Sequence, residues 1–141
     1  MAKGFSATVD KWTRKTEART EAVFKQSAQT LFEQAQTTIG EGGKLPLDTG
    51  WLRASFSASL QGMPAGVGAN PYKSGSQQAD WNSADTVLTI NGAKLGDSIW
   101  AGWGAVYARA MEYKYGFSRS AAQNWSAIVN QTAAEAKARF G

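Results

Sequence analysis

Three neighbouring residues, Asp48, Thr49 and Gly50, form the tripeptide that carries the catalytic carboxylate of aspartic proteases. Such an enzyme needs two carboxylates that share one proton, and a chain of 141 residues could supply both only as a symmetric dimer. The next residue is the bulky Trp51, where that class of protease keeps a small Ser or Ala. We therefore interpret Asp48 and Gly50 as a structural turn, in which Asp48 accepts hydrogen bonds from N–H groups two or three residues on and Gly50 permits a tight backbone.

Other residue patterns that carry chemistry are incomplete. The glycines before Lys44 suggest a phosphate-binding loop, but that motif requires Gly six positions before the Lys and Ser or Thr after it. Thr38 and Leu45 occupy those positions. The chain has no Cys and no His, which removes most transition-metal sites and the usual nucleophile–base pairs. We expect no catalytic residue, no cofactor, no metal ligand and no enzymatic activity.

The composition fits one folded domain over residues 1–141. Hydrophobic residues make up 43% of the chain, and the net charge is +4. Basic residues outnumber acidic ones in residues 1–25, which is compatible with a polyanion partner or with a solvated helix face. No apolar run could span a membrane and no signal peptide begins the chain, so we expect a protein made in a cytoplasm, with no membrane partner.

One long helix is predicted over residues 5–39, because its apolar residues recur at spacings of three and four. Gly40 is expected to end it. Such a helix would be about 50 Å long at about 1.5 Å per residue, which exceeds the span of a compact domain of this size. We therefore expect part of the helix to project or to pack against another chain. Trp12 and Trp125 lie at helical core spacing and are expected to pack inside the domain.

The middle of the chain predicts strands around a long loop. Residues 51–60 alternate apolar and polar side chains, as a strand does. Residues 61–85 are rich in Gly, Pro, Ser and Asn and predict a loop. Residues 86–103 are interpreted as hairpin strands, with residues 86–90 as the first strand and Asn91-Gly92 as the turn.

Two helices are predicted at the C-terminal end, a short one over residues 105–113 and a longer one over 120–139. Ser120 and Gln123 have the spacing of a capping box at the start of the second helix. The predicted class is α+β, with a long N-terminal helix and a C-terminal helix packed on a small antiparallel sheet, and with a long loop.

The predicted loop contains two aromatic residues, Tyr72 and Trp81. Aromatic residues in a polar loop commonly anchor it in a pocket of the same chain or of a partner. A loop of this length is uncommon in a compact domain unless it has a function. From chain entropy alone, shortening it is expected to be neutral or slightly stabilising.

Three segments together carry a resemblance to a known family. The segment around Gly50 and Arg53 reads "LDTGWLRASF", the segment around Glu112 reads "VYARAMEYKYG", and the segment around Arg119 reads "GFSRSAAQNWSAIVNQTAAEAK". In this order they resemble the bacteriophage tail-completion proteins, also called head–tail joining or neck proteins, of the minor tail protein Z type. Three residues separate Glu112 from Gly116, where that family usually has one, and the Pro frequent before its C-terminal helix is absent.

The resemblance implies a structural virion protein of a long-tailed phage. It would form a homo-oligomeric, hexameric ring at the neck and join the tail to the DNA-filled head, without catalysis. Its partners would be copies of itself, the neighbouring head-connector and tail-terminator or tail-tube proteins, and the genomic DNA that passes through the lumen. Two alternatives remain open: a tail terminator or other ring-forming tail protein, and a small basic nucleic-acid-binding module.

The matched segments also suggest which residues contact a partner. Arg53, Glu112 and Arg119 lie inside them, and Tyr72 and Trp81 lie in the predicted loop. These five are the expected assembly contacts. The alternative for Arg53 and Arg119 is an ordinary salt bridge with Glu112.

Overall fold

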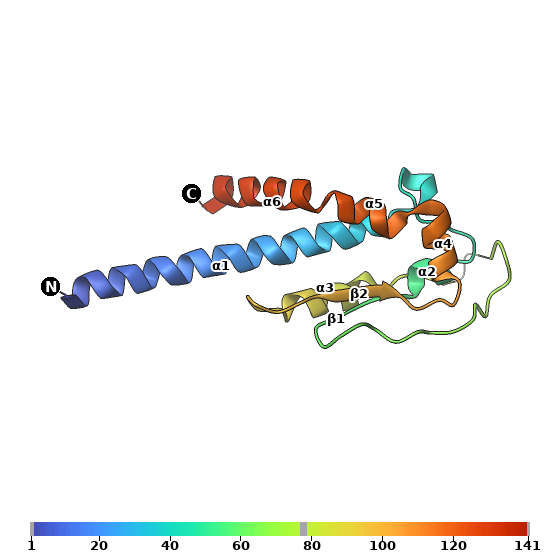
Figure 1. Ribbon diagram of the computed structural model, residues 1–141, viewed down its shortest axis with the longest axis horizontal. Coiled ribbons are helices and arrows are strands. Elements are labelled where there is room, and N and C mark those ends of the chain that lie inside the picture. Colours follow the sequence, from blue (N-terminus) through green and yellow to red (C-terminus); the bar gives the residue numbers. More distant parts are fainter. Residues whose placement is uncertain (1, 77–78, 141) are drawn as a thin grey trace.

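The computed structural model describes residues 2–76 and 79–140. Figure 1 shows the long helix α1 (Ala2–Ala35) with α6 (Trp125–Phe140) alongside it and running in the opposite direction. A small sheet and α3 lie on the other side of α1. The described residues confirm the α+β class with a long N-terminal helix, a C-terminal helix and a two-stranded antiparallel sheet. The remaining elements are η1 (Ile39–Glu41), α2 (Trp51–Ala54), β1 (Phe56–Ser59), α3 (Ser83–Asn91), β2 (Trp100–Trp103), α4 (Ala108–Tyr115) and α5 (Phe117–Gln123).

The core is a row of aromatic rings that joins the helices to the sheet. Phe56 of β1 packs against Phe32 of α1, with ring centroids 5.3 Å apart, and against its cross-strand partner Trp103, 5.1 Å away. Trp103 in turn packs against Phe117 of α5 at 4.8 Å. These pairs connect two buried clusters, one around Phe32 and Ile90 and the other around Leu45 and Phe117. Among the described helices, none has the length and apolarity needed to cross a membrane.

The long helix ends earlier than predicted. Its last residue is Ala35, and Gln36 leaves the helix with its side chain fully buried. Gln36 Nε2 donates to the Arg53 carbonyl oxygen at 2.8 Å, and its Oε1 accepts from Trp103 Nε1 at 2.8 Å. These bonds fix the turn, so that Ile39 belongs to η1 and is half exposed.

The predicted strand over residues 51–60 is wrong in its first half. Residues 51–54 form the helical turn α2, which begins after Gly50, and the strand covers Phe56–Ser59 alone. Leu52 and Phe56 are four residues apart, and this spacing belongs to a helix as well as to an alternating strand. Leu52 is buried in the cluster around Phe117, and Ser55 closes the turn by donating to the Leu52 carbonyl oxygen at 2.6 Å.

The first predicted hairpin strand is also wrong. Residues 86–90 belong to α3, and Asn91-Gly92 ends that helix instead of making a hairpin turn. Thr86 and Ile90 are buried one helical turn apart, and Ile90 packs with Phe32 and Phe56. Tertiary packing has therefore overridden β-propensity here. The strand that pairs with β1 is β2, at the end of the range 86–103 that was predicted to hold the hairpin strands.

The C-terminal prediction placed one helix too early and the other too late. The helix predicted over 105–113 is α4, eight residues that begin at Ala108, and the next helix starts at Phe117 instead of Ser120. Ser120 lies inside α5, so the predicted capping box does not form. Gly116 separates the two helices with a φ of 67°, and Asn124 separates α5 from α6.

The predicted loop over residues 61–85 ends before α3. Within it, Gln77 and Gln78 lie outside the described residues. We call residues 61–76 and 79–82 the strap, because Figure 1 shows this segment running beside the sheet from β1 toward the end that holds α2 and α4, and then back to α3.

Candidate assembly surfaces

The first surface is the N-terminal part of α1. Every side chain from residue 6 to residue 18 is exposed, and we call this segment the arm. Figure 1 shows that the arm extends past the end of α6 and past the sheet. The projection predicted from helix length is therefore confirmed. The expectation that Trp12 packs inside the domain is wrong, since its side chain is 67% exposed. Trp125 is half-buried.

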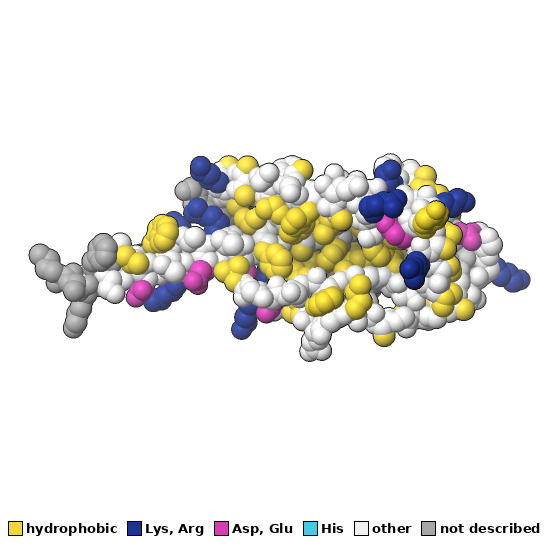
Figure 2. All heavy atoms as spheres, in the orientation of Figure 1, with side chains coloured by type: hydrophobic (Ala, Val, Ile, Leu, Met, Phe, Trp, Pro, Cys, Tyr) yellow, Lys and Arg dark blue, Asp and Glu magenta, His cyan; other side chains and the backbone are white. Residues whose placement is uncertain are grey.

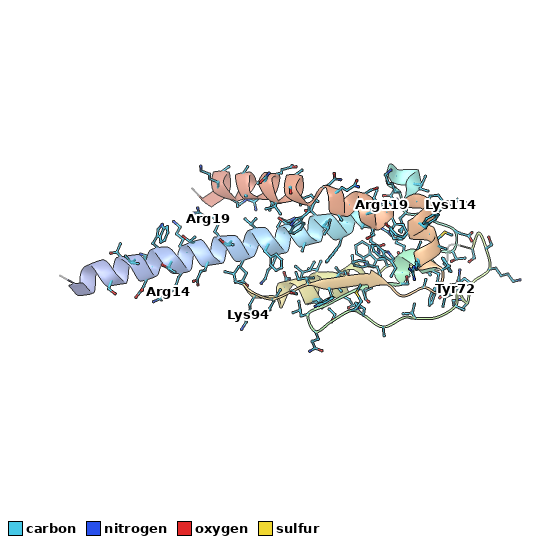
Figure 3. All side chains as sticks on the ribbon, in the orientation of Figure 1. Arg14, Arg19, Tyr72, Lys94, Lys114 and Arg119 are labelled. Atoms are coloured by element: carbon cyan, nitrogen blue, oxygen red, sulfur yellow. The ribbon has the colours of Figure 1, made fainter. Side chains whose placement is uncertain are left out.

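The arm carries charges of both signs. Asp10 and Glu17 are seven residues apart and form an acidic stripe, and Arg14 lies beside it, four residues after Asp10 and three before Glu17. Lys11, Lys15 and Arg19 follow at intervals of four and form a basic stripe on another side. Figure 2 shows acidic and basic side chains along the arm, and Figure 3 shows Arg14 and Arg19 leaving α1 in different directions.

The wider face beside α1 is apolar. Figure 2 shows hydrophobic side chains gathered along the middle of the molecule, between α6 and the layer that holds the sheet. A hollow of about 190 Å³ on α1 is lined by Lys15, Ala18, Arg19 and Ala22. A contiguous apolar area on a small protein is a common mark of a protein–protein contact.

Arg53 and Trp81 are both half-buried and contact each other. The Arg53 guanidinium lies over the Trp81 ring, 5.2 Å from its centroid, and Trp81 packs edge-on against Phe56 at 5.8 Å. Arg53 Nε also donates to the Gln36 carbonyl oxygen at 2.9 Å. Its acidic neighbour is Asp80 at 4.0 Å, and not Glu112. These two residues therefore tie α1, α2 and the end of the strap together.

Asp48 and Gly50 are structural, but their partners are distant in sequence. The Asp48 carboxylate accepts hydrogen bonds from the Ser74 hydroxyl and from the Gly75 backbone N–H. The predicted bonds to residues two or three positions on do not form with Asp48; instead Thr49 Oγ1 accepts from the Trp51 N–H at 3.1 Å. Gly50 has a φ of 86°, and a Cβ there would lie 2.1 Å from the Ala79 carbonyl oxygen.

The strap is held to the body along its length. Asn70 Nδ2 donates to Thr49 Oγ1 at 2.8 Å, and Asn70 Oδ1 accepts from the Tyr72 N–H at 2.9 Å. The Tyr72 ring packs edge-on against Trp51 at 6.1 Å. Further along, the Val67 N–H donates to the Gly104 carbonyl oxygen at 2.9 Å. Tyr72 is therefore an anchor within its own chain.

A pocket of about 430 Å³ opens beside these contacts. Its lining includes Asp48, Thr49, Asn70 and Tyr107. Burial raises the pKa of the Tyr107 hydroxyl above its usual value of 10.0, and the Asp48 carboxylate raises it further. Hydrogen bonds to Thr49 and Asn70 act in the opposite direction. Tyr107 therefore stays a neutral phenol that contributes to the polar network under the strap.

Glu112 and Arg119 meet at the junction of α4 and α5, but through the backbone of Arg119. The Glu112 carboxylate accepts from the N–H groups of Ser118 and Arg119, at 2.8 and 2.9 Å. It thus satisfies two free N–H groups in the first turn of α5, the role that sequence reasoning gave to Ser120. The Arg119 side chain is exposed, and its guanidinium lies over Gly116, where a Cβ would be 2.8 Å from Nη2. Figure 3 places Arg119 near Lys114, at the opposite end of the molecule from the arm.

Sequence reasoning missed the residues that organise these contacts, above all Gln36 and Asn70. A buried Gln on a helical sequence has no signal of its own, because Gln is a good helix former and is mostly exposed. Asn70 is followed by Pro71, a turn signal that could have marked the strap as ordered. Of the five expected contacts, Arg53, Tyr72 and Trp81 lie near the strap, while Glu112 and Arg119 lie at the α4–α5 junction.

Comparisons with models of protein families, with curated proteins and with solved structures return no match to this chain. Within residues 2–76 and 79–140, no three His, Cys, Asp or Glu side chains form a group that could hold a metal ion. The function is therefore argued from the geometry of the surfaces and from the sequence motifs.

Proposed function

We propose that this chain is a structural protein of a long-tailed phage virion, which forms a ring at the neck and joins the tail to the DNA-filled head. The observation that carries the proposal is the arm, whose side chains are all exposed although it continues a packed helix. Tertiary packing supplies most of the stability of helices in proteins. A bare helical extension with an exposed Trp12 is therefore suited to contact with another chain.

The segments that carry the family resemblance support the proposal in a second way. Gly50, Glu112 and Gly116 each fix a backbone turn around the cluster of Leu52 and Phe117. A pattern with this structural role fits a protein that assembles and does not catalyse. The proposed partners are copies of the chain in a hexameric ring, the adjoining connector and tail proteins, and the DNA in the lumen.

A nucleic-acid-binding module is the second candidate, because the basic stripe of Lys11, Lys15 and Arg19 could meet phosphates. The acidic stripe on the same arm weakens that interpretation, since Asp10 and Glu17 would repel a polyanion that wraps the helix. A tail terminator would use the same arm in a ring of the same particle.

The neck role is tested by removing the gene from the phage that encodes it and imaging the particles by electron microscopy. DNA-filled heads and free tails are expected to accumulate, and the purified protein is expected to join them when added back. Tails of uncontrolled length would instead indicate a tail terminator. Normal joined particles without the protein would refute the proposal, and salt-sensitive DNA binding by a monomer would favour the nucleic-acid module.

A further inference from the structure

The charges on the arm form no ion pair within the described part of the chain. The ion pairs among residues 2–76 and 79–140 are Lys25 with Glu21 and Arg53 with Asp80. Lys11, Lys15 and Arg19 stand at intervals of four residues, and like charges at that spacing destabilise a helix. Arg19 is half-buried and its Nε is covered by atoms of its own chain, whereas Lys11 and Lys15 are exposed. The exposed part of the basic stripe can therefore meet counter-charges that another molecule supplies.

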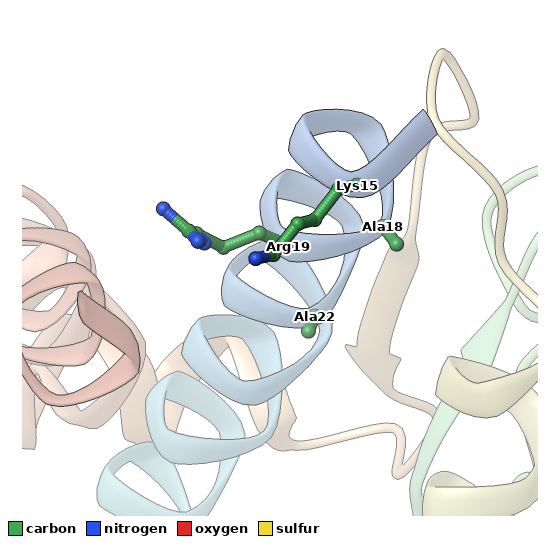
Figure 4. Close-up of a pocket in the computed structure, with 4 residues that line it drawn as sticks. All are labelled: Lys15, Ala18, Arg19 and Ala22. Atoms are coloured by element: carbon green, nitrogen blue, oxygen red, sulfur yellow. The ribbon is translucent and has the colours of Figure 1, made fainter. Parts of the chain in front are cut away.

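The surroundings of the basic stripe point to a helix as the occupant. Ala18 and Ala22 form a low floor beside Lys15 and Arg19, and Figure 4 shows the Lys15 side chain running along the helix while the Arg19 guanidinium extends toward α6. Small side chains in a groove let the ridge of a second helix approach closely. A phosphate backbone would need no such floor.

The counter-charges of matching spacing are on the arm itself. With about 100° of rotation per residue, Asp10 and Glu17 lie within about 20° of each other around α1, and their direction is about 150° from the centre of the basic stripe. Arg14 lies about 50° to one side of the two carboxylates, so the acidic stripe has a basic edge. A helix with unlike stripes on different sides can bind one neighbour through each stripe. Such a heterologous contact closes into a ring when the rotation between copies allows it.

We infer that the arm is an interface between copies of this chain, in which the acidic stripe of one copy lies on the basic stripe of the next. The inference deepens the proposed function, because it names the surface through which the copies meet. The arm is about 20 Å long at about 1.5 Å per residue. One contact of this size is below the area of a stable interface, about 1,000 Å². Two copies are therefore expected to associate weakly, and a ring is expected to be more stable because each copy in it makes two such contacts.

The test uses two variants of the full chain. In the first, Asp10→Lys with Glu17→Lys makes both stripes basic; in the second, Lys11→Glu with Lys15→Glu makes both stripes acidic. Sedimentation velocity is measured at about 0.05 M and about 0.5 M salt, since salt screens exposed charges. The wild type is expected to associate more strongly at low salt. Each variant alone is expected to lose roughly tenfold or more in association constant.

The decisive measurement is the equimolar mixture of the two variants. Because each copy then finds a neighbour of opposite charge on both sides, the mixture is expected to associate at low salt although neither variant does so alone. The control is Lys94→Glu with Lys114→Glu, which changes the net charge by the same amount as the second variant but away from the arm. It is expected to associate like the wild type.

Several outcomes would overturn the inference. A mixture that stays monomeric, with arms that circular dichroism shows to be helical, would do so, as would variants that associate normally by themselves. If dichroism shows that the charge-reversed arms have unfolded, the neutral changes Asp10→Asn with Glu17→Gln replace them, and unchanged association would again contradict the inference. A monomeric wild type at low salt would also contradict it, while the proposed neck role would still be decided separately by the particle images.

Discussion

Gly50 is the residue at which conformation and space both require glycine. Its φ of 86° is unfavourable for other residues, and a Cβ there would lie 2.1 Å from the Ala79 carbonyl oxygen. Gly42 has a similar φ of 94° but open space around it. We predict that Gly42→Ala costs about 1–2 kcal/mol, the usual penalty of a left-handed residue. Gly50→Ala should cost clearly more, because the strap must also move.

The measurement for this pair is chemical denaturation of the two variants beside the wild type. The two variants share the backbone penalty, so the difference between their losses of unfolding free energy measures the clash with Ala79. Equal losses would mean that the strap yields freely at this point.

At Arg53, one substitution can separate the contribution of the hydrogen bond to stability from that of the charge. Arg53→Lys keeps a positive charge near Asp80, which is 91% exposed and adds little to stability. The same substitution removes the Nε–H that donates to the Gln36 carbonyl oxygen. We predict a loss of about 1–2 kcal/mol in unfolding free energy. Arg14→Lys, on the exposed arm, is the control and should change nothing. If the melting temperature of Arg53→Lys is unchanged, Arg53 does not stabilise the fold in this way, and a contact with a partner becomes its expected role.

The structural role of Asp48 and Gly50 could be predicted from their types, whereas their partners could not. Asp favours turns and Gly permits a left-handed residue, and both statements are local. The bonds from Asp48 to Ser74 and Gly75 cross 26 and 27 residues of chain. No spacing rule connects such positions, because their approach depends on how the whole strap folds back.

At the scale of elements, the helices were predicted better than the strands. The apolar pattern of α1 is long and regular, so the sequence predicted a helix there correctly, although it placed the end of the helix too late. Four of the five residues 86–90 are β-branched and the apolar run is short, so propensity favoured a strand over the helix that they form. Asn82 and Asp85 offered a helix-start signal, and Asn82 Nδ2 donates to Asp85 Oδ2 at 3.0 Å. The prediction did not use that signal, because it rested on the β-propensity of residues 86–90 and on the Asn91-Gly92 pair.

The strap is more ordered than its composition suggests, and this changes the expected effect of altering it. Chain entropy alone favours a shorter loop, but removing Ala65–Gln78 would also remove the bonds of Asn70 and the packing of Tyr72 on Trp51. We predict that Asn70→Ala costs about 1–3 kcal/mol, because Thr49 and the Tyr72 N–H lose a partner.

Limited proteolysis of the strap and denaturation measure this effect together. Faster cleavage within residues 61–76 and a lower unfolding free energy are expected for Asn70→Ala. Asn130→Ala, at an exposed position of α6, serves as the control and should leave both unchanged. If Asn70→Ala is cleaved at the same rate as the wild type, the packing of Tyr72 on Trp51 is sufficient to hold the strap.

At the scale of the whole molecule, the arm and the body should behave as separable parts. The side chains of residues 6–18 are exposed. By contrast, the rest of α1 packs against α6, and its residues Ala28 and Phe32 lie in a buried cluster with Phe56 and Ile90. We predict that a chain that begins at residue 17 keeps the body folded, with a change in melting temperature of less than about 2 °C. The same chain should lose self-association, because both charge stripes are shortened.

Calorimetry and sedimentation of the truncated chain test the two halves of this prediction independently. A point variant, Trp12→Ser, removes the largest exposed side chain of the arm without shortening it, and should leave the melting temperature unchanged while weakening association. A fall of ten degrees or so in the truncated chain would show that the arm stabilises the body. A truncated chain that still associates would move the interface from the arm to the apolar face between α6 and the sheet, since that face remains intact in it.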